Sequence, residues 1–175
     1  MEDIRNKMEQ DPRFFVNNET MDSLFANHTI YDYRIEEIPV GKIRRTVKKK
    51  IYKLEDTINY KVLVNRYDGK MIKEYNDYSR MTNNTKDNSS RSLKTYDSLI
   101  NTFTIEDYSL EKGAIIVNQY NFIVDGLHRS CILLDKYGPN YKIEVVKIHC
   151  KVAKRTVLTA PLFEILLQIK GSKHE

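Results

Sequence analysis

The sequence predicts one α/β (α+β) domain in which a small mixed β-sheet is flanked by helices. Short apolar runs rich in β-formers lie at residues 31–40, 114–124 and 143–148, separated by turn residues. Between them, apolar residues at 96–103 recur at i, i+3, i+4 and i+7, which is typical of an amphipathic helix. The 175 residues suit one domain with short extensions.

The predicted organisation has three parts. Residues 1–28 are polar with scattered apolar pairs and are interpreted as a helical N-terminal extension, with a helix starting at Asp11-Pro12. Residues 29–152 form the domain. Residues 153–175 form a C-terminal helix that starts near Pro161. This apolar helix packs onto the domain or supports a homodimer.

Composition restricts the partners only loosely. The net charge of +5 is compatible with nucleic acid or with phosphorylated small molecules. The two cysteines form no CxxC pattern, which favours a reducing, cytoplasmic location. No run approaches the ~20 apolar residues that span a bilayer, so no membrane partner is expected.

Three segments ahead of residue 96 allow two interpretations each. The basic cluster at 44–50 is a solvated face or a surface that contacts nucleic acid or an anionic ligand. The apolar run at 60–64 fits a helix or a strand equally well. Residues 80–92 are dense in turn formers and predict an exposed loop, which is either a functional lid or disordered.

The most informative pattern is a strand, a turn and a helix. A β-rich run at 114–117 and a turn at 118–121 lead to a second strand at 122–124. Asp125-Gly126 follows, and then an apolar helix at 128–137 that ends at Gly138-Pro139. The backbone N–H groups that open such a helix have no intrahelical partner and lie at the positive end of its dipole.

This turn is a predicted phosphate site. Gly126 lets a bulky anion approach the backbone, and Leu127 contributes its amide. His128, Arg129 and Ser130 add side-chain donors, and the planar guanidinium of Arg129 matches phosphate oxygens. Asp125 has three open roles: it caps the helix, holds Mg²⁺, or accepts a hydroxyl proton during phosphoryl transfer.

The segment 123–133 (IVDGLHRSCIL) resembles the phosphate-binding core of the ParB/sulfiredoxin superfamily, and 33–43 (YRIEEIPVGKI) resembles its opening strand and turn. The resemblance spans residues 31–150 but is specific only at 125–130. Leu127 stands where sulfiredoxins need a catalytic cysteine, which argues against that chemistry. The chain also lacks the length for the helix-turn-helix domain of ParB partition proteins.

The D-G-x-H-R turn is similar to that of free serine kinases in this superfamily and to proteins of bacterial surface-polysaccharide gene clusters. The resemblance implies a nucleotide-dependent kinase or phosphotransferase that uses ATP or ADP, or another nucleoside triphosphate, with Mg²⁺. The acceptor would be a sugar, polyol or amino-acid hydroxyl. Asp125, or Glu36 or Glu37 in place of the family's upstream glutamate, takes the acceptor proton.

In this interpretation His128 and Arg129 hold the transferring phosphates. Lys42, Arg44 and Arg80 either clamp phosphate or are surface charges. Two alternatives remain open: a ParB-like DNA-binding or nuclease protein, and a non-catalytic module that senses nucleotide.

Overall fold

The computed structural model describes residues 2–47, 50–65, 68–83, 98–100 and 108–151. The described elements follow in chain order: α1 (Glu2–Gln10), α2 (Asn18–Asn27), β1 (Ile30–Pro39), η1 (Val40–Lys42), β2 (Arg44–Val47), β3 (Lys50–Lys53), η2 (Leu54–Asp56), α3 (Ile58–Val64), α4 (Gly69–Asn83), α6 (Leu110–Gly113), β4 (Ile116–Asn118), β5 (Ile123–Asp125), α7 (Leu127–Tyr137) and β6 (Lys142–Cys150). The expected C-terminal helix at 153–175 lies outside the described residues.

In the part of the chain that the structure describes, the main sheet has four strands in the order β1-β6-β4-β5. The β1–β6 and β4–β5 pairs are antiparallel, and β4 runs parallel to β6. A parallel pair needs a crossover connection, which β5 and α7 supply here. The predicted α+β class with a mixed sheet is therefore confirmed, as are the 114–124 hairpin, the motif helix and the 143–148 strand.

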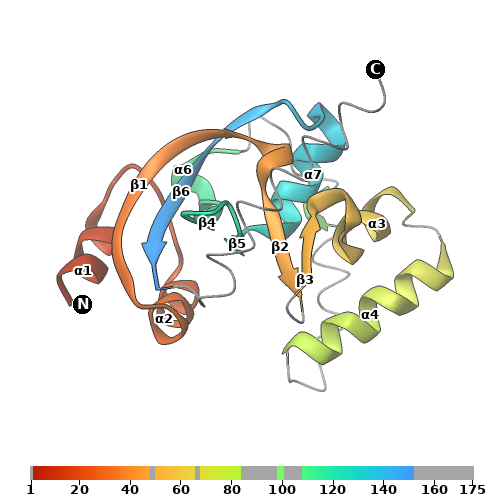
Figure 1. Ribbon diagram of the computed structural model, residues 1–175, viewed down its shortest axis with the longest axis horizontal. Coiled ribbons are helices and arrows are strands. Elements are labelled where there is room, and N and C mark those ends of the chain that lie inside the picture. The colour runs from red at the N-terminus through yellow and green to blue at the C-terminus, as the bar shows by residue number, and fades with distance from the viewer. Residues whose placement is uncertain (1, 48–49, 66–67, 84–97, 101–107, 152–175) are drawn as a thin grey trace.

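The two faces of this sheet are covered by different helices (Figure 1). On one face, Val117, Val145 and Ile123 pack in a core cluster with residues of α7, α3 and α4. On the other face, Val146 and Ile148 pack with residues of α1 and α2. Strand β6 is therefore apolar on both faces, as expected for a strand buried on both sides.

A separate hairpin, β2–β3, lies beside the main sheet. It is attached at Arg44, which forms a parallel bridge to Phe122 just before β5. The hairpin, α3 and α4 gather on the α7 side of the molecule (Figure 1). Helices α3 and α4 bring Asn59 and Tyr75 within hydrogen-bond distance of His128 in the first turn of α7.

The predicted helix start at Asp11-Pro12 is wrong, because α1 has already ended at Gln10. The Asp11 carboxylate accepts hydrogen bonds from the Arg13 guanidinium and the Tyr33 hydroxyl, which tie this residue to β1 instead of a helix cap. The Arg13 hydrogen bonds lower the pKa of Asp11 to about 2. Helix α2 begins later, where the Asn17 side chain accepts the Thr20 N–H.

The predicted loop at 80–92 is also wrong in its first part, because α4 continues through Asn83. Asp68 begins this helix by accepting the Lys70 N–H at 2.8 Å, and Tyr75 anchors it in the core. The rest of that segment lies outside the described residues. The 60–64 run belongs to a helix, α3, capped by Thr57. Of the expected helix at 96–103, residues 98–100 are described and are helical.

Within the described part of the chain, no helix combines the length and the apolar composition that crossing a membrane requires.

Candidate functional site

The strand-turn-helix is built around Gly126. Strand β5 ends at Asp125, and Gly126 then adopts the left-handed conformation with φ 85° and ψ 22°. A Cβ at this position would come within 2.9 Å of Ile115 Cγ1, so the turn requires glycine for both conformation and space. Helix α7 begins at the next residue without a capping side chain from its N-cap. The first turn of α7 lies at the positive end of the helix dipole, which is where anions bind to helices.

Arg129 braces the backbone beneath this turn. Its guanidinium donates to the carbonyl oxygens of Gly113 and Ala114, the latter at 3.1 Å. It also forms an ion pair with Asp125 at 3.4 Å. Among the described residues, the Asp125 carboxylate pairs with Arg129 and with no first-turn amide, so the capping role considered for Asp125 is not observed.

Ser130 is fully buried. Its hydroxyl donates to the Gly126 carbonyl at 3.0 Å and so stabilises the first turn of α7 from the core side. The side chain faces away from the surface where an anion would approach. The backbone N–H of Ser130 donates to the same Gly126 carbonyl at 2.9 Å, so both donors of Ser130 are engaged within the turn and the predicted phosphate contact is not observed.

His128 points in a different direction from Asp125, toward α3 and α4. Its Nε2 lies 2.9 Å from Asn59 Nδ2 and 2.8 Å from the Tyr75 hydroxyl. Because an amide nitrogen only donates, Nε2 is the acceptor and the ring proton is on Nδ1. Burial lowers the pKa of His128 to about 4, helped by the positive charges of Arg45 and Arg129. The ring is therefore neutral at pH 7.

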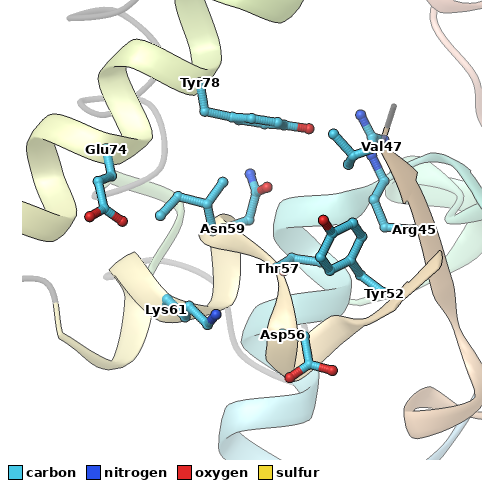
Figure 2. A pocket seen from close by; sticks show the side chains of 10 residues that line it. Arg45, Val47, Tyr52, Asp56, Thr57, Asn59, Lys61, Glu74 and Tyr78 are labelled. Atoms are coloured by element: carbon cyan, nitrogen blue, oxygen red, sulfur yellow. The ribbon is translucent and has the colours of Figure 1, made fainter. Parts of the chain in front are cut away.

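Asn59 connects the motif to a pocket of about 250 Å³ between the β2–β3 hairpin, α3 and α4 (Figure 2). The pocket is lined by Arg45, Val47, Tyr52, Asp56, Thr57, Ile58, Asn59, Lys61, Glu74 and Tyr78. In Figure 2, Tyr78 of α4 lies on one side and Tyr52 of β3 on another, with Arg45 beside them. We call this the hairpin pocket.

Arg45 carries an unsatisfied donor at this pocket. Its Nε is buried and has no hydrogen-bond partner among the described residues. Because Arg45 also lines the pocket, its positive charge favours an anionic group there. Lys61 adds a second positive charge, whereas Asp56 and Glu74 are the acidic residues of the lining.

The glutamates proposed from the family resemblance lie elsewhere. Glu36 and Glu37 are in β1, at the opposite edge of the sheet from β5, so about three strand spacings, ~14 Å, separate them from Asp125. Glu36 forms ion pairs with Arg34 and Lys147. Burial raises its pKa, but these two cations outweigh burial and the net pKa is lowered. Glu37 pairs with Lys142 at 3.1 Å. The structure does not bring either glutamate to the motif.

The predicted basic clamps are also dispersed. Lys42 is exposed in η1. Arg44 is 5% exposed, and its guanidinium donates to the carbonyl oxygens of Gly41 and Ile43. The side chain of Arg80 lies outside the described residues. Among the described residues of this basic cluster, Arg45 is the one that lines the hairpin pocket.

Sequence reasoning missed Asn59 and Tyr75 as site residues, and it included Arg45 only as a member of the basic cluster at 44–50. Tyr75 belongs to an apolar pattern with Met71, Ile72 and Tyr78 that could have revealed α4. Asn59 has no comparable signal, because its role arises only when α3 packs against α7.

The described residues contain no group of three or more histidine, cysteine, aspartate or glutamate side chains able to hold a metal ion. Asp125 is a single, partly exposed carboxylate. That donor set fits Mg²⁺ carried largely by substrate phosphates, which needs only one or two protein carboxylates.

Comparison with known proteins found no matching family model, no matching curated protein and no matching solved structure.

Proposed function

We propose that this protein is a nucleotide-dependent phosphotransferase with a ParB/sulfiredoxin-like fold, and that its phosphate site is the first turn of α7. Support comes from the strand-turn-helix, with a left-handed glycine between β5 and the start of α7. The mixed sheet of β1, β6, β4 and β5 is compatible with that fold.

The observation that carries the proposal is the connection from His128 through Asn59 to the hairpin pocket, which the positively charged Arg45 lines. A nucleotide would place its phosphates between the α7 amides and Arg45, and its base or ribose beside Tyr52 and Tyr78. The pocket's 250 Å³ is below the ~300–1,000 Å³ of typical ligand sites, so it would hold one part of the nucleotide.

In this proposal each motif residue has a distinct role. The first-turn amides and Arg45 hold the phosphates, and neutral His128 keeps α3 and α4 in place against the motif. Asp125, on the other side of the turn, accepts the proton of the hydroxyl that attacks the terminal phosphorus. When bound, Mg²⁺ would neutralise the charge on the phosphates.

The first test is a thermal-shift screen with ATP, ADP, CTP and GTP in the presence of Mg²⁺. A ligand at 100 times its Kd stabilises the native state by about 2.7 kcal/mol. We expect the Arg45→Gln variant to weaken nucleotide binding at least tenfold. Lys7→Gln is the matched control, because it removes the same charge from α1 and loses only an exposed ion pair. Arg129 is unsuited to this test because it braces Gly113 and Ala114.

A second measurement separates catalysis from nucleotide sensing. We expect Asp125→Asn to retain the nucleotide shift but to lose at least 100-fold in acceptor-dependent phosphate transfer. Nucleotide binding without transfer to any hydroxylated acceptor would support the sensing module instead. The absence of any nucleotide shift in a folded protein would refute the proposal. Duplex DNA binding that falls steeply with salt would then favour the DNA-binding alternative.

A further inference from the structure

A second pocket lies on the other side of the motif turn, and Asp125 lines it. This pocket of about 540 Å³ is between α2 and the end of β5. Its lining consists of Glu19, Thr20, Ser23, Leu24, Asn27, His28, Val124 and Asp125. We call it the α2 pocket. Its volume is within the ~300–1,000 Å³ of small-molecule sites and exceeds that of the hairpin pocket.

The residues that α2 contributes follow helical spacing. Thr20, Ser23 and Asn27 recur at i, i+3 and i+7, so short hydroxyl and amide side chains share one face of the helix. The Asn27 amide donates to the Ser23 carbonyl at 2.8 Å, which fixes that side chain and leaves its oxygen available as an acceptor. A face of this kind offers many weak donors and acceptors, as hydroxylated ligands need.

His28 adds an acceptor of defined orientation. Its Nδ1 lies 3.2 Å from the Leu24 carbonyl, and only a protonated nitrogen makes a hydrogen bond to a carbonyl. In the neutral ring Nε2 is then the acceptor. Leu24 and Val124 supply an apolar area within the same lining, against which the carbon skeleton of a ring could pack.

The charge of the lining narrows the ligand class. Glu19 and Asp125 are acidic, and no lysine or arginine lines this pocket among the described residues. The exposed Glu19 carboxylate repels an anion, whereas the charge of Asp125 is partly compensated by its ion pair with Arg129 at 3.4 Å. The α2 pocket therefore disfavours sugar acids and molecules that are already phosphorylated.

We propose that the α2 pocket is the acceptor site of the phosphotransferase, and that it takes an uncharged or cationic polyhydroxylated molecule such as a sugar or an amino sugar. This inference rests on the proposed function. Asp125 and His128 are three residues apart, so their Cα atoms lie within about 10 Å. The motif turn thus separates a nucleotide side, reached by His128, from an acceptor side, lined by Asp125.

The proposed reaction is a displacement at the terminal phosphorus of the nucleotide. The acceptor oxygen bonds to the terminal phosphorus of the nucleotide while the bond from that phosphorus to the bridging oxygen breaks. The hydroxyl proton passes to the Asp125 carboxylate, and the nucleotide leaves with one phosphate fewer.

The test uses three sugars of similar size and different charge: glucosamine, glucose and glucuronate. With ATP and Mg²⁺, we expect phosphate transfer to glucosamine and glucose, and at least a tenfold lower kcat/KM for glucuronate. A preference for glucuronate would overturn the proposal. So would the absence of both transfer and thermal stabilisation with all three sugars.

The matched variants are Ser23→Leu and Ala26→Leu. Both enlarge a small exposed residue of α2, but only Ser23 lines the pocket. We expect Ser23→Leu to raise the acceptor KM at least tenfold and to leave the nucleotide thermal shift unchanged. Ala26→Leu should change neither. Equal effects of the two variants, or no effect of Ser23→Leu, would overturn the assignment.

A separate readout distinguishes this inference from the proposed function. Glucosamine alone, without nucleotide, should stabilise the wild type and Ala26→Leu but not Ser23→Leu. If no nucleotide binds and this pattern still holds, the phosphotransferase proposal fails while the hydroxylated-ligand site stands. If nucleotide binds but the pattern is absent, only the acceptor site fails.

Discussion

Gly126 is the residue on which the motif turn depends most directly. Its φ of 85° is unfavourable for any residue with a Cβ, and Ile115 occupies the space that a Cβ would need. We expect Gly126→Ala to lower the free energy of unfolding by about 2–4 kcal/mol, because backbone strain and overpacking each cost ~1–3 kcal/mol. Urea denaturation measures this difference.

The control is Gly69→Ala in the first turn of α4, where a Cβ meets nothing within 4 Å. Alanine is the better helix former, so this change should stabilise the protein slightly, by less than ~1 kcal/mol. Equal effects of the two substitutions would contradict the special role assigned to Gly126.

His128 gives the native state a defined acid sensitivity. Because its pKa is lowered from 6.5 to about 4, the unfolded chain takes up a proton at a higher pH than the native protein does. The contribution of neutral His128 to the free energy of unfolding is fully present above pH ~6.5. It is lost as the pH falls toward ~4, and the loss is at most about 3 kcal/mol. We expect His128→Gln to flatten the pH dependence of stability in this range.

Denaturation series at pH 7, 6, 5 and 4 would check this prediction. His149→Gln is the matched control, because it removes a histidine from β6 and leaves His128 in place. A wild-type acid slope that survives in His128→Gln would show that other groups cause it.

Among the elements, the start of α7 and the segment before β4 depend on each other through Arg129. The guanidinium, 21% exposed, satisfies the carbonyl oxygens of Gly113 and Ala114 and pairs with Asp125. We expect Arg129→Met to destabilise the protein by about 2–4 kcal/mol, since charged hydrogen bonds contribute ~1.5–3 kcal/mol each and are not additive. Thermal unfolding would measure the loss.

Lys142→Met is a suitable comparison, because Lys142 and its ion-pair partner Glu37 both have exposed side chains. Such pairs contribute ~0–1 kcal/mol, so this variant should behave almost like the wild type. A similar small effect for Arg129→Met would mean that its guanidinium is free to serve a ligand instead of the backbone.

For the whole molecule, strand β6 joins two cores that lie on opposite faces of the sheet. Val145 packs with the α7 side and Val146 with the α1–α2 side, and both are fully buried. We expect Val145→Ala and Val146→Ala each to destabilise by ~1–3 kcal/mol and to lower one common transition.

Calorimetry of both variants tests whether the N-terminal helices unfold with the domain. Two separate transitions, with Val146→Ala affecting only the first, would mean that residues 1–28 are an independent extension. A single transition would mean that α1 and α2 belong to the cooperative unit.

The sequence by itself determined the elements whose signals are local. Alternation at 31–38 predicted β1, and the turn residues at 118–121 predicted the β4–β5 hairpin. Gly138 after an apolar helix predicted the end of α7. The structure has each of these elements. The sequence also placed Gly126 in the turn that opens α7, as the residue that lets an anion approach the backbone; that this turn needs glycine for a left-handed conformation is a finding of the structure.

Only the tertiary structure decided what surrounds that turn. Packing between segments distant in sequence decided that the 60–64 run is helical and that α4 ends at Asn83. It also decided that Asn59 and Tyr75 contact His128. The strand order likewise separated Glu36 and Glu37 from Asp125 by the width of the sheet. Local residue patterns encode backbone conformation, whereas the position of one side chain against another depends on the whole fold.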